Sequence, residues 1–166
     1  MLAKIISGGQ TGADQAGVRT ARRFGLPTGG HMPPGFETKD GPRPEFAGLF
    51  GMVEFPGGYR ERTRENVRVS DGTVRFAANW TSLGERCTAT AIRDFRKPSI
   101  DVDIREPIPV ERVADWILAN DIRVLNVAGN TQPASPGARS FAITAFVEDY
   151  LGRVFELLGV GGPVAV

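Results

Sequence analysis

The stretch KIISGGQTGAD (Lys4–Asp14) predicts a strand, a tight turn and a helix in direct succession. An apolar run, Ile5-Ile6, meets a turn rich in glycine. Beyond the turn, apolar residues recur at helical spacing from Ala13 onward, at Ala16, Val18, Ala21 and Phe24. Gly25 and Pro27 are residues that end helices, so the helix is expected to stop before them.

The turn is a candidate anion cradle. Glycine lets the backbone approach a ligand closely, and the free amides at a helix start attract anions, helped by roughly half a unit of positive dipole charge. The alternative is a tight connection without a ligand, since neither Gly-Lys-Ser/Thr nor G-x-G-x-x-G is present. The residues expected to bind a phosphate or nucleotide here are Gly8, Gly9, Gln10, Thr11, Gly12 and Asp14.

Length and composition set the broad class. A chain of 166 residues predicts a single domain spanning 1–166. The net charge of +1 comes without a basic tract, so we expect no nucleic-acid partner. No signal peptide or membrane-spanning run is evident, which predicts a cytoplasmic protein without a membrane partner. One cysteine, Cys87, and one histidine, His31, argue against a disulfide or a protein-ligated metal.

Strands and helices are expected to alternate along the chain. The strands are predicted at Thr28–His31, Thr73–Ala77, Ser99–Val102 and Arg123–Ala128, after a first strand that contains the apolar run Ile5-Ile6. The later helices are predicted at Tyr59–Val69, Arg86–Arg96, Val110–Asn120 and Pro136–Leu158. This alternation is typical of an α/β sandwich with a mostly parallel sheet and right-handed crossovers.

The segment 27–58 is dense in glycine and proline and is predicted to be a long loop, except for the short strand named above. The following segment, YRERTRENVRV (Tyr59–Val69), is ambiguous between helix and strand, and we favour a helix. Its charges form either a solvated face or, through Arg62 and Asn66 four residues apart, a face directed at a bound anion.

Three polar loops are expected at the carboxyl ends of strands: Gly8–Asp14, Ala78–Thr88 and Gly129–Gly137. Ligands of parallel α/β sheets bind at these ends. Thr88 and Thr90 are expected in the first turns of a helix, where their hydroxyls meet a ligand or cap the helix. The three loops together favour anion or nucleotide binding more strongly than the first loop alone.

The last predicted helix carries a broad apolar stripe, including Ile143, Val147, Leu151 and Val154. We interpret the excess apolar surface as a subunit interface of a homodimer or homotetramer. The alternative is that the helix is buried within its own chain.

Four motifs in order, GGQTGAD (Gly8–Asp14), RTRENV (Arg62–Val67), SDGTV (Ser70–Val74) and LNVAG…SPG (Leu125–Gly137), resemble the family named putative molybdenum carrier proteins. The resemblance implies a Rossmann-like three-layer sandwich, an oligomer, and an anionic ligand suggested to be the molybdenum cofactor (molybdopterin) or a nucleotide. Molybdoenzymes are then expected partners. By matching motif, it adds these ligand-binding residues to those of the first loop: Arg62, Thr63, Asn66, Ser70, Asp71, Gly72, Thr73, Asn126, Ala128, Gly129, Ser135 and Gly137. Thr88 joins this set because of its expected place in the first turns of a helix.

Related phosphoribohydrolases carry P-G-G-x-G-T-x-x-E, whose Glu acts on an N-glycosidic bond. The corresponding stretch here is Leu83–Ala91, which lacks the glycine cluster and places Ala91 where the Glu is expected. We therefore rank a binding protein first and a nucleoside monophosphate phosphoribohydrolase second. The acid–base candidates for that enzyme are Asp14, His31, Asp71 and Glu85. A protein-interaction module that uses the last helix ranks third.

Overall fold

The computed structural model describes residues 1–132 and 142–161. Its main sheet has six strands, all paired in parallel, in the order β5-β2-β1-β8-β6-β7. The strands are β1 (Lys4–Ile6), β2 (Thr28–Met32), β5 (Met52–Glu54), β6 (Gly72–Ala77), β7 (Ser99–Asp103) and β8 (Val124–Gly129). The predicted α/β, Rossmann-like class is thereby confirmed.

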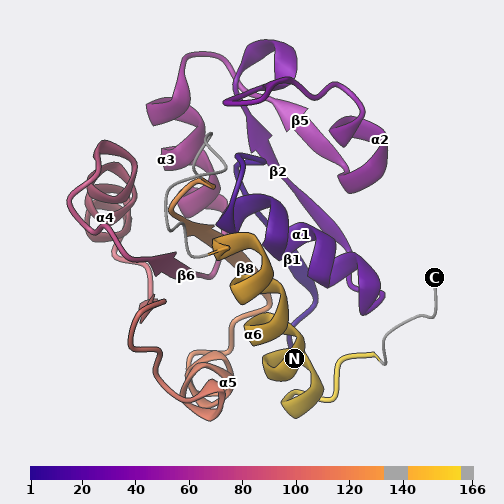
Figure 1. Ribbon diagram of the computed structural model, residues 1–166, viewed down its shortest axis with the longest axis vertical. Helices are drawn as coiled ribbons and strands as arrows, with labels where there is room; N and C mark the ends of the chain where they lie inside the picture. The colour runs from indigo at the N-terminus through magenta and orange to yellow at the C-terminus, as the bar shows by residue number, and fades with distance from the viewer. Residues whose placement is uncertain (133–141, 162–166) are drawn as a thin grey trace.

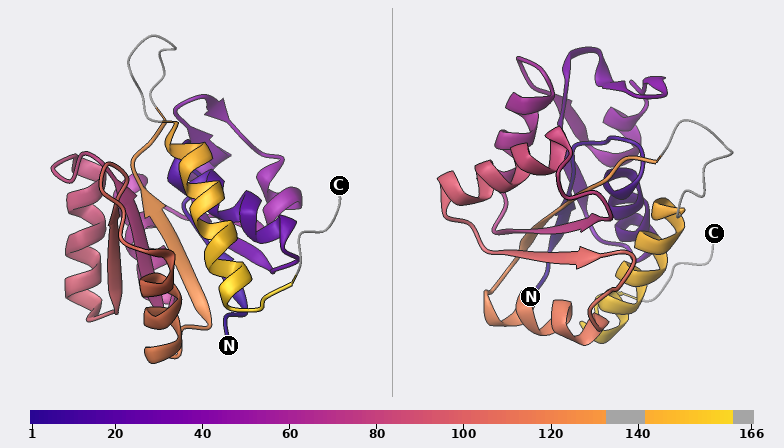
Figure 2. Two further views of the ribbon diagram at one scale, coloured as in Figure 1. Left: turned by 60° about the horizontal axis from the view of Figure 1, so that its bottom comes forward. Right: turned by 60° about the vertical axis from the view of Figure 1, so that its left-hand side comes forward.

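Helices cover both faces of this sheet (Figures 1 and 2). On one face lie α1 (Ala13–Arg23), α5 (Val110–Ala119) and α6 (Ile143–Leu157), with α6 packed against both of the others. On the opposite face α3 (Tyr59–Val69) and α4 (Leu83–Phe95) pack side by side. The close approach of α1 to β8 requires Gly17, because a Cβ there would lie 2.7 Å from the Val127 side chain.

The strand order places three loops together at one edge of the sheet. From β1 the chain moves to β2 on one side, whereas from β6 it moves to β7 on the other side. The last strand, β8, fills the gap between β1 and β6, with Ile6 paired to Asn126 and Asn126 to Thr73. The loops after β1, β6 and β8 therefore meet at the carboxyl edge, as is usual for ligand sites of such sheets.

Segment 27–58 is more regular than the predicted loop. It holds β2, a hairpin of β3 (Glu37–Thr38) and β4 (Gly41–Pro42), a 3-10 turn (Pro34–Phe36), α2 (Phe46–Phe50) and β5, the edge strand of the main sheet. The prediction of a long loop is therefore wrong. The elements other than β2 were missed because each is only two to five residues long, which is too short for hydrophobic periodicity to be recognised.

Two helix starts also differ from the predictions. Helix α4 begins at Leu83, not Arg86, because the Ser82 side chain accepts a hydrogen bond from Glu85 N at 3.3 Å and so caps the helix. Helix α6 begins at Ile143 and its cap, Ala142, has a non-helical backbone. A continuous helix from Pro136 is therefore wrong at Ala142, and the predicted first turns lie outside the described residues.

The apolar stripe of α6 is buried within the chain. Ile143, Val147, Leu151, Val154 and Phe155 are at most 2% exposed, and all belong to the main hydrophobic core. The excess apolar surface that motivated an oligomer is thus used inside the monomer, and the oligomer stays a prediction. None of the described helices combines the length and apolar character needed to cross a bilayer.

Candidate functional site

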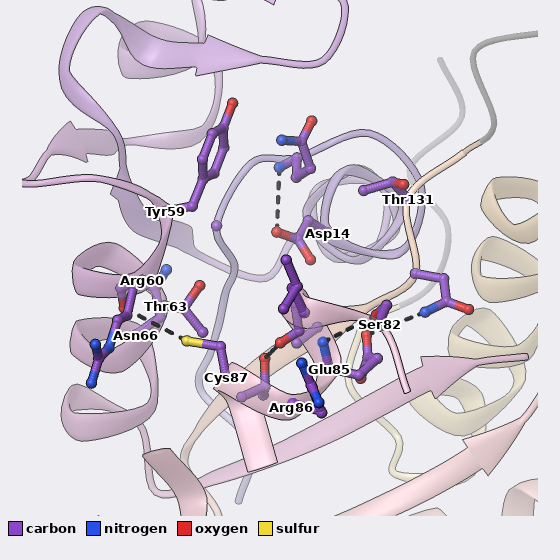
Figure 3. Close-up of a pocket in the computed structure, with 18 of the residues that line it drawn as sticks. Asp14, Tyr59, Arg60, Thr63, Asn66, Ser82, Glu85, Arg86, Cys87 and Thr131 are labelled. Atoms are coloured by element: carbon purple, nitrogen blue, oxygen red, sulfur yellow. Dashed lines mark hydrogen bonds between the residues drawn. The ribbon is translucent and has the colours of Figure 1, made fainter. Parts of the chain in front are cut away.

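A cavity of about 1020 Å³ opens at the carboxyl edge of the sheet, between the first turns of α3 and α4 and the ends of β1 and β8. Figure 3 shows residues of α3 and α4 along two sides of the opening, with Asp14 and Thr131 along another. The volume is that of a site for an organic ligand of nucleotide size. Its lining includes Gly8, Gln10, Asp14, Lys39, Tyr59, Arg60, Arg62, Asn66, Glu85, Arg86, Asn126 and Asn130.

Asp14 lies in the second position of α1 and is held by Arg62. The Asp14 Oδ2 to Arg62 Nη1 distance is 3.5 Å, and the two side chains are only 7% and 11% exposed. Burial raises the pKa of the Asp14 carboxyl, although the Arg62 charge and amide hydrogen bonds act in the opposite direction. Gly8 makes room for this pair, since a Cβ there would lie 1.6 Å from Arg62 Nη1.

Much of the predicted anion cradle is bonded within the chain. Gln10 N donates to Asp14 Oδ2 at 3.3 Å, and Gly9 N donates to Ser7 Oγ at 3.2 Å. Thr11 N donates to Gln10 Oε1 at 3.0 Å, while Ala13 N donates to the Asn130 carbonyl at 3.2 Å. The Asp14 carboxylate therefore takes a place at this helix start that a bound anion would otherwise take.

Glu85 is the second buried carboxyl of the cavity. Ser82 and Glu85 form the S-x-x-E pattern of a capping box, but the Glu85 side chain lies 3.6 Å from Arg75 Nη1 and accepts a bond from Asn130 Nδ2 at 3.4 Å. Arg75 is itself bonded through two nitrogens to Asp101, at 2.6 and 2.8 Å. Glu85 is 2% exposed, and burial raises its pKa to about 7, against the attraction of Arg75.

Two contacts join distant segments around the cavity. Asn130, after β8, accepts hydrogen bonds from the backbone N–H groups of Ala78 and Asn79 at 2.9 and 2.8 Å. From the β3–β4 hairpin, Lys39 N donates to Gln10 Oε1 at 2.9 Å and Lys39 Nζ donates to Thr131 at 2.7 Å. The hairpin is thus tied to both sides of the site.

The rim of the cavity is basic. Lys39, Arg60 and Arg86 are exposed there, and none of them forms an ion pair with the part of the chain that the structure describes. Arg60 and Arg86 come from the first turns of α3 and α4, whose dipoles add positive potential at the same place. The arrangement favours an anionic group at the rim.

The structure brings many of the predicted ligand residues to the cavity, but not all of them. Those lining it are Gly8, Gln10, Asp14, Arg62, Thr63, Asn66, Thr88, Asn126, Ala128 and Gly129. Those outside its lining are Gly9, Thr11, Gly12, Ser70, Asp71, Gly72 and Thr73. Ser135 and Gly137 lie outside the described residues.

Several predicted ligand residues make contacts within the fold. Asn66 joins α3 to β2, accepting from His31 N at 2.8 Å and donating to His31 O at 3.0 Å. Asp71 lies at the amino end of β6, where its Oδ2 accepts from Arg123 N and Val124 N at 3.0 and 2.7 Å. The Thr88 hydroxyl donates to Gly84 O at 3.0 Å, so it does not cap α4.

The lining residues that were not predicted as ligand contacts include Lys39, Tyr59, Asn130 and the two rim arginines, Arg60 and Arg86. Glu85 was named only as an acid–base candidate. The Ser82-x-x-Glu85 pattern could have placed Glu85 at a helix start, and Tyr59 begins the predicted helix of α3. No local pattern marks Lys39 or Asn130, because their positions depend on contacts between distant segments.

Residues 1–132 and 142–161 contain no cluster of side chains suited to bind a metal ion. No group of three or more His, Cys, Asp or Glu is arranged there to hold a metal ion. Cys87 lines the cavity, but burial raises the pKa of its thiol and disfavours the thiolate that metals prefer.

The parallel sheet, the three loops that meet at its carboxyl edge and the cavity with a basic rim define a Rossmann-like protein with a candidate site at that edge. Residues 5–151 match the circularly permutated YpsA SLOG family, and the chain belongs to it. A 1.45 Å crystal structure from Syntrophus aciditrophicus SB, of a protein named "Putative molybdenum carrier protein", is 33% identical. The alignment covers 93% of this chain and 94% of that one, with a TM-score of 0.79, and confirms the resemblance found in the sequence. None of the curated proteins matches the chain.

Proposed function

We propose that the protein is a carrier that binds a phosphate-bearing anionic ligand at the carboxyl edge of its sheet. The observation that supports this most directly is the basic rim, where Lys39, Arg60 and Arg86 surround the opening of a cavity of about 1020 Å³. The molybdenum carrier name of the related crystal structure makes the molybdenum cofactor the first ligand to consider.

The residues of the site suit the phosphate of such a cofactor better than its metal. Three basic side chains at the rim supply the donors that phosphate oxygens need. By contrast, Cys87 has a raised thiol pKa and no neighbouring cluster of metal ligands in the described residues. Bound cofactor would supply the molybdenum, while Lys39, Arg60 and Arg86 would hold the phosphate end.

The first test is native mass spectrometry of gently purified protein, with the molybdenum content measured in parallel. We expect a retained phosphate-bearing mass, and the same spectrum reports whether the chain forms the proposed homodimer or homotetramer.

The second test measures by calorimetry how tightly the protein binds molybdopterin and guanosine 5′-monophosphate (GMP). Arg86→Gln should weaken both and reduce the salt dependence of binding, since it removes a rim charge. Arg112→Gln, on the exposed side of α5, is the matched control. Equal affinities of the two variants for both probes would contradict the proposed site.

A second function is favoured by Glu85. A carboxyl with a pKa near 7 inside a ligand cavity is suited to general acid–base work at neutral pH. A nucleoside monophosphate phosphoribohydrolase is therefore the alternative. Base release from GMP or AMP that is lost in Glu85→Gln would support the enzyme. Absence of release at high protein concentration would leave the carrier.

A further inference from the structure

The buried carboxyl of Glu85 is short of hydrogen-bond donors. Glu85 Oε2 accepts no hydrogen bond from the described residues, and Oε1 accepts only the 3.4 Å bond from Asn130. Arg75 Nη1 is 3.6 Å from Oε2, beyond hydrogen-bond distance, because the guanidinium is directed to Asp101. A carboxylate offers about four lone pairs, so a side chain only 2% exposed is left with most of them unused.

Whereas Glu85 is short of hydrogen-bond donors, several basic side chains of the cavity lack acceptors in the described part of the chain. Arg60 and Arg86 at the rim are donors, and so is Arg62, whose buried Nε has no partner among the described residues. A bare oxyanion such as phosphate or molybdate would satisfy these donors. It would also add like charge beside Glu85 and leave Oε2 without a donor.

The size and the mouth of the cavity also favour an organic ligand. Its volume of about 1020 Å³ is far more than one oxyanion fills. Tyr59, in the first turn of α3, is 47% exposed and lines the cavity, and the Arg62 guanidinium lies 5.6 Å from its ring centre. An exposed ring of this kind can stack on a planar heterocycle.

The anionic end of the ligand belongs at the rim, not in the first loop. Asp14 already accepts from Gln10 N and pairs with Arg62 at 3.5 Å. An anionic ligand group in the first loop would lie beside the Asp14 carboxylate and be repelled by it. Arg60 and Arg86, at the starts of α3 and α4, carry no such internal partner within the described residues.

We infer that the ligand is a phosphate-bearing amino-heterocycle, with a ring amino group donating to Glu85 and the phosphate held by Arg60 and Arg86. Purine nucleotides and pterin phosphates both have this chemistry. The inference rests on the proposed function and narrows its ligand class, because it excludes the bare oxyanion as the principal ligand. It also assigns Glu85 as a specificity-determining residue.

The test compares ligands that differ in one group, by calorimetry at about pH 8, where Glu85 is ionised. GMP carries a 2-amino group, inosine 5′-monophosphate (IMP) lacks it, and ribose 5-phosphate lacks the whole heterocycle. We expect IMP to bind at least tenfold more weakly than GMP, since a hydrogen bond to a charged group is lost. Ribose 5-phosphate should be weaker still. A pterin bearing a phosphomonoester identifies the source: tighter binding than GMP points to a pterin, and weaker binding to a nucleotide.

Glu85→Gln should bring the GMP and IMP affinities within about threefold of each other. Glu106→Gln, an exposed change outside the cavity, should preserve the difference. Equal affinities of GMP and IMP for the unmodified protein would overturn the inference, as would a Glu85→Gln variant that keeps the preference. Ribose 5-phosphate binding as tightly as GMP would refute the inference and leave the proposed function standing. Binding of none of the phosphate-bearing probes would refute both.

Discussion

Replacing Glu85 by Gln should make the protein more stable at alkaline pH. Burial raises the pKa of this carboxyl from an ordinary 4.5 to about 7. The folded state therefore holds a proton that the unfolded state has already released, and stability falls as the pH rises from about 4.5 through about 7. Each unit of pKa shift corresponds to about 1.4 kcal/mol. Glu85 should thus lower the free energy of unfolding by about 2 to 3 kcal/mol between pH 5 and pH 8.

The assay is urea unfolding of both proteins at about pH 5 and pH 8, with the difference between them taken at each pH. Glutamine has nearly the same shape and no charge, so Glu85→Gln should lack this loss of stability. Asp14, whose raised pKa acts in the same direction, is present in both proteins and largely cancels. Glu106→Gln should follow the unmodified protein at both pH values. A stability difference between Glu85→Gln and the unmodified protein that is the same at pH 5 and pH 8 would refute the reasoning.

Two further substitutions test the contacts around the cavity. Gly8→Ala places a Cβ 1.6 Å from the present position of Arg62 Nη1, so the guanidinium must move away from Asp14. We expect the free energy of unfolding, measured with urea or by heating, to fall by about 1–3 kcal/mol, and GMP to bind more weakly. If GMP affinity and stability are both unchanged, the Arg62 position is not what the site requires. Asn66→Ala removes the bonds that join α3 to the His31 backbone and should destabilise by about 1–3 kcal/mol, more than Asn120→Ala, which removes one exposed bond on α5. Equal losses in the two Asn variants would argue against this contact.

The parts of the fold that were predicted correctly are those with strong local signals. The apolar pair Ile5-Ile6, the glycine turn and the helical spacing from Ala13 all lie within one short stretch, and β1 and α1 form there as expected. Helix α3 was chosen over a strand on the spacing of its charges alone and occupies Tyr59–Val69 as predicted. Strand β5, by contrast, has three residues and gains its identity from pairing with β2, which no local pattern records.

The site was predicted only in part because it is built by contacts between distant segments. The loops at its edge follow from the rule that parallel strands present ligands at their carboxyl ends. The partners of individual side chains do not follow from that rule. Asn66 was assigned to the ligand by matching motif, and it lines the cavity, but its amide bonds to the His31 backbone, thirty-five residues away in the sequence. Lys39 reaches the cavity because the β3–β4 hairpin folds back onto Gln10 and Thr131.

Glu85 connects the stability of the chain with its proposed function. A buried carboxyl that lowers the free energy of unfolding by about 2 to 3 kcal/mol between pH 5 and pH 8 is unfavourable for folding alone. A ligand amino group donating to Glu85 would supply a hydrogen bond that the described residues do not, and would favour the ionised form. Bound ligand should therefore stabilise the unmodified protein more than Glu85→Gln, and the difference should increase as the pH rises through 7. Glu85 would thus make the protein less stable without ligand but more selective for its ligand, a trade-off between stability and function that is common at functional sites.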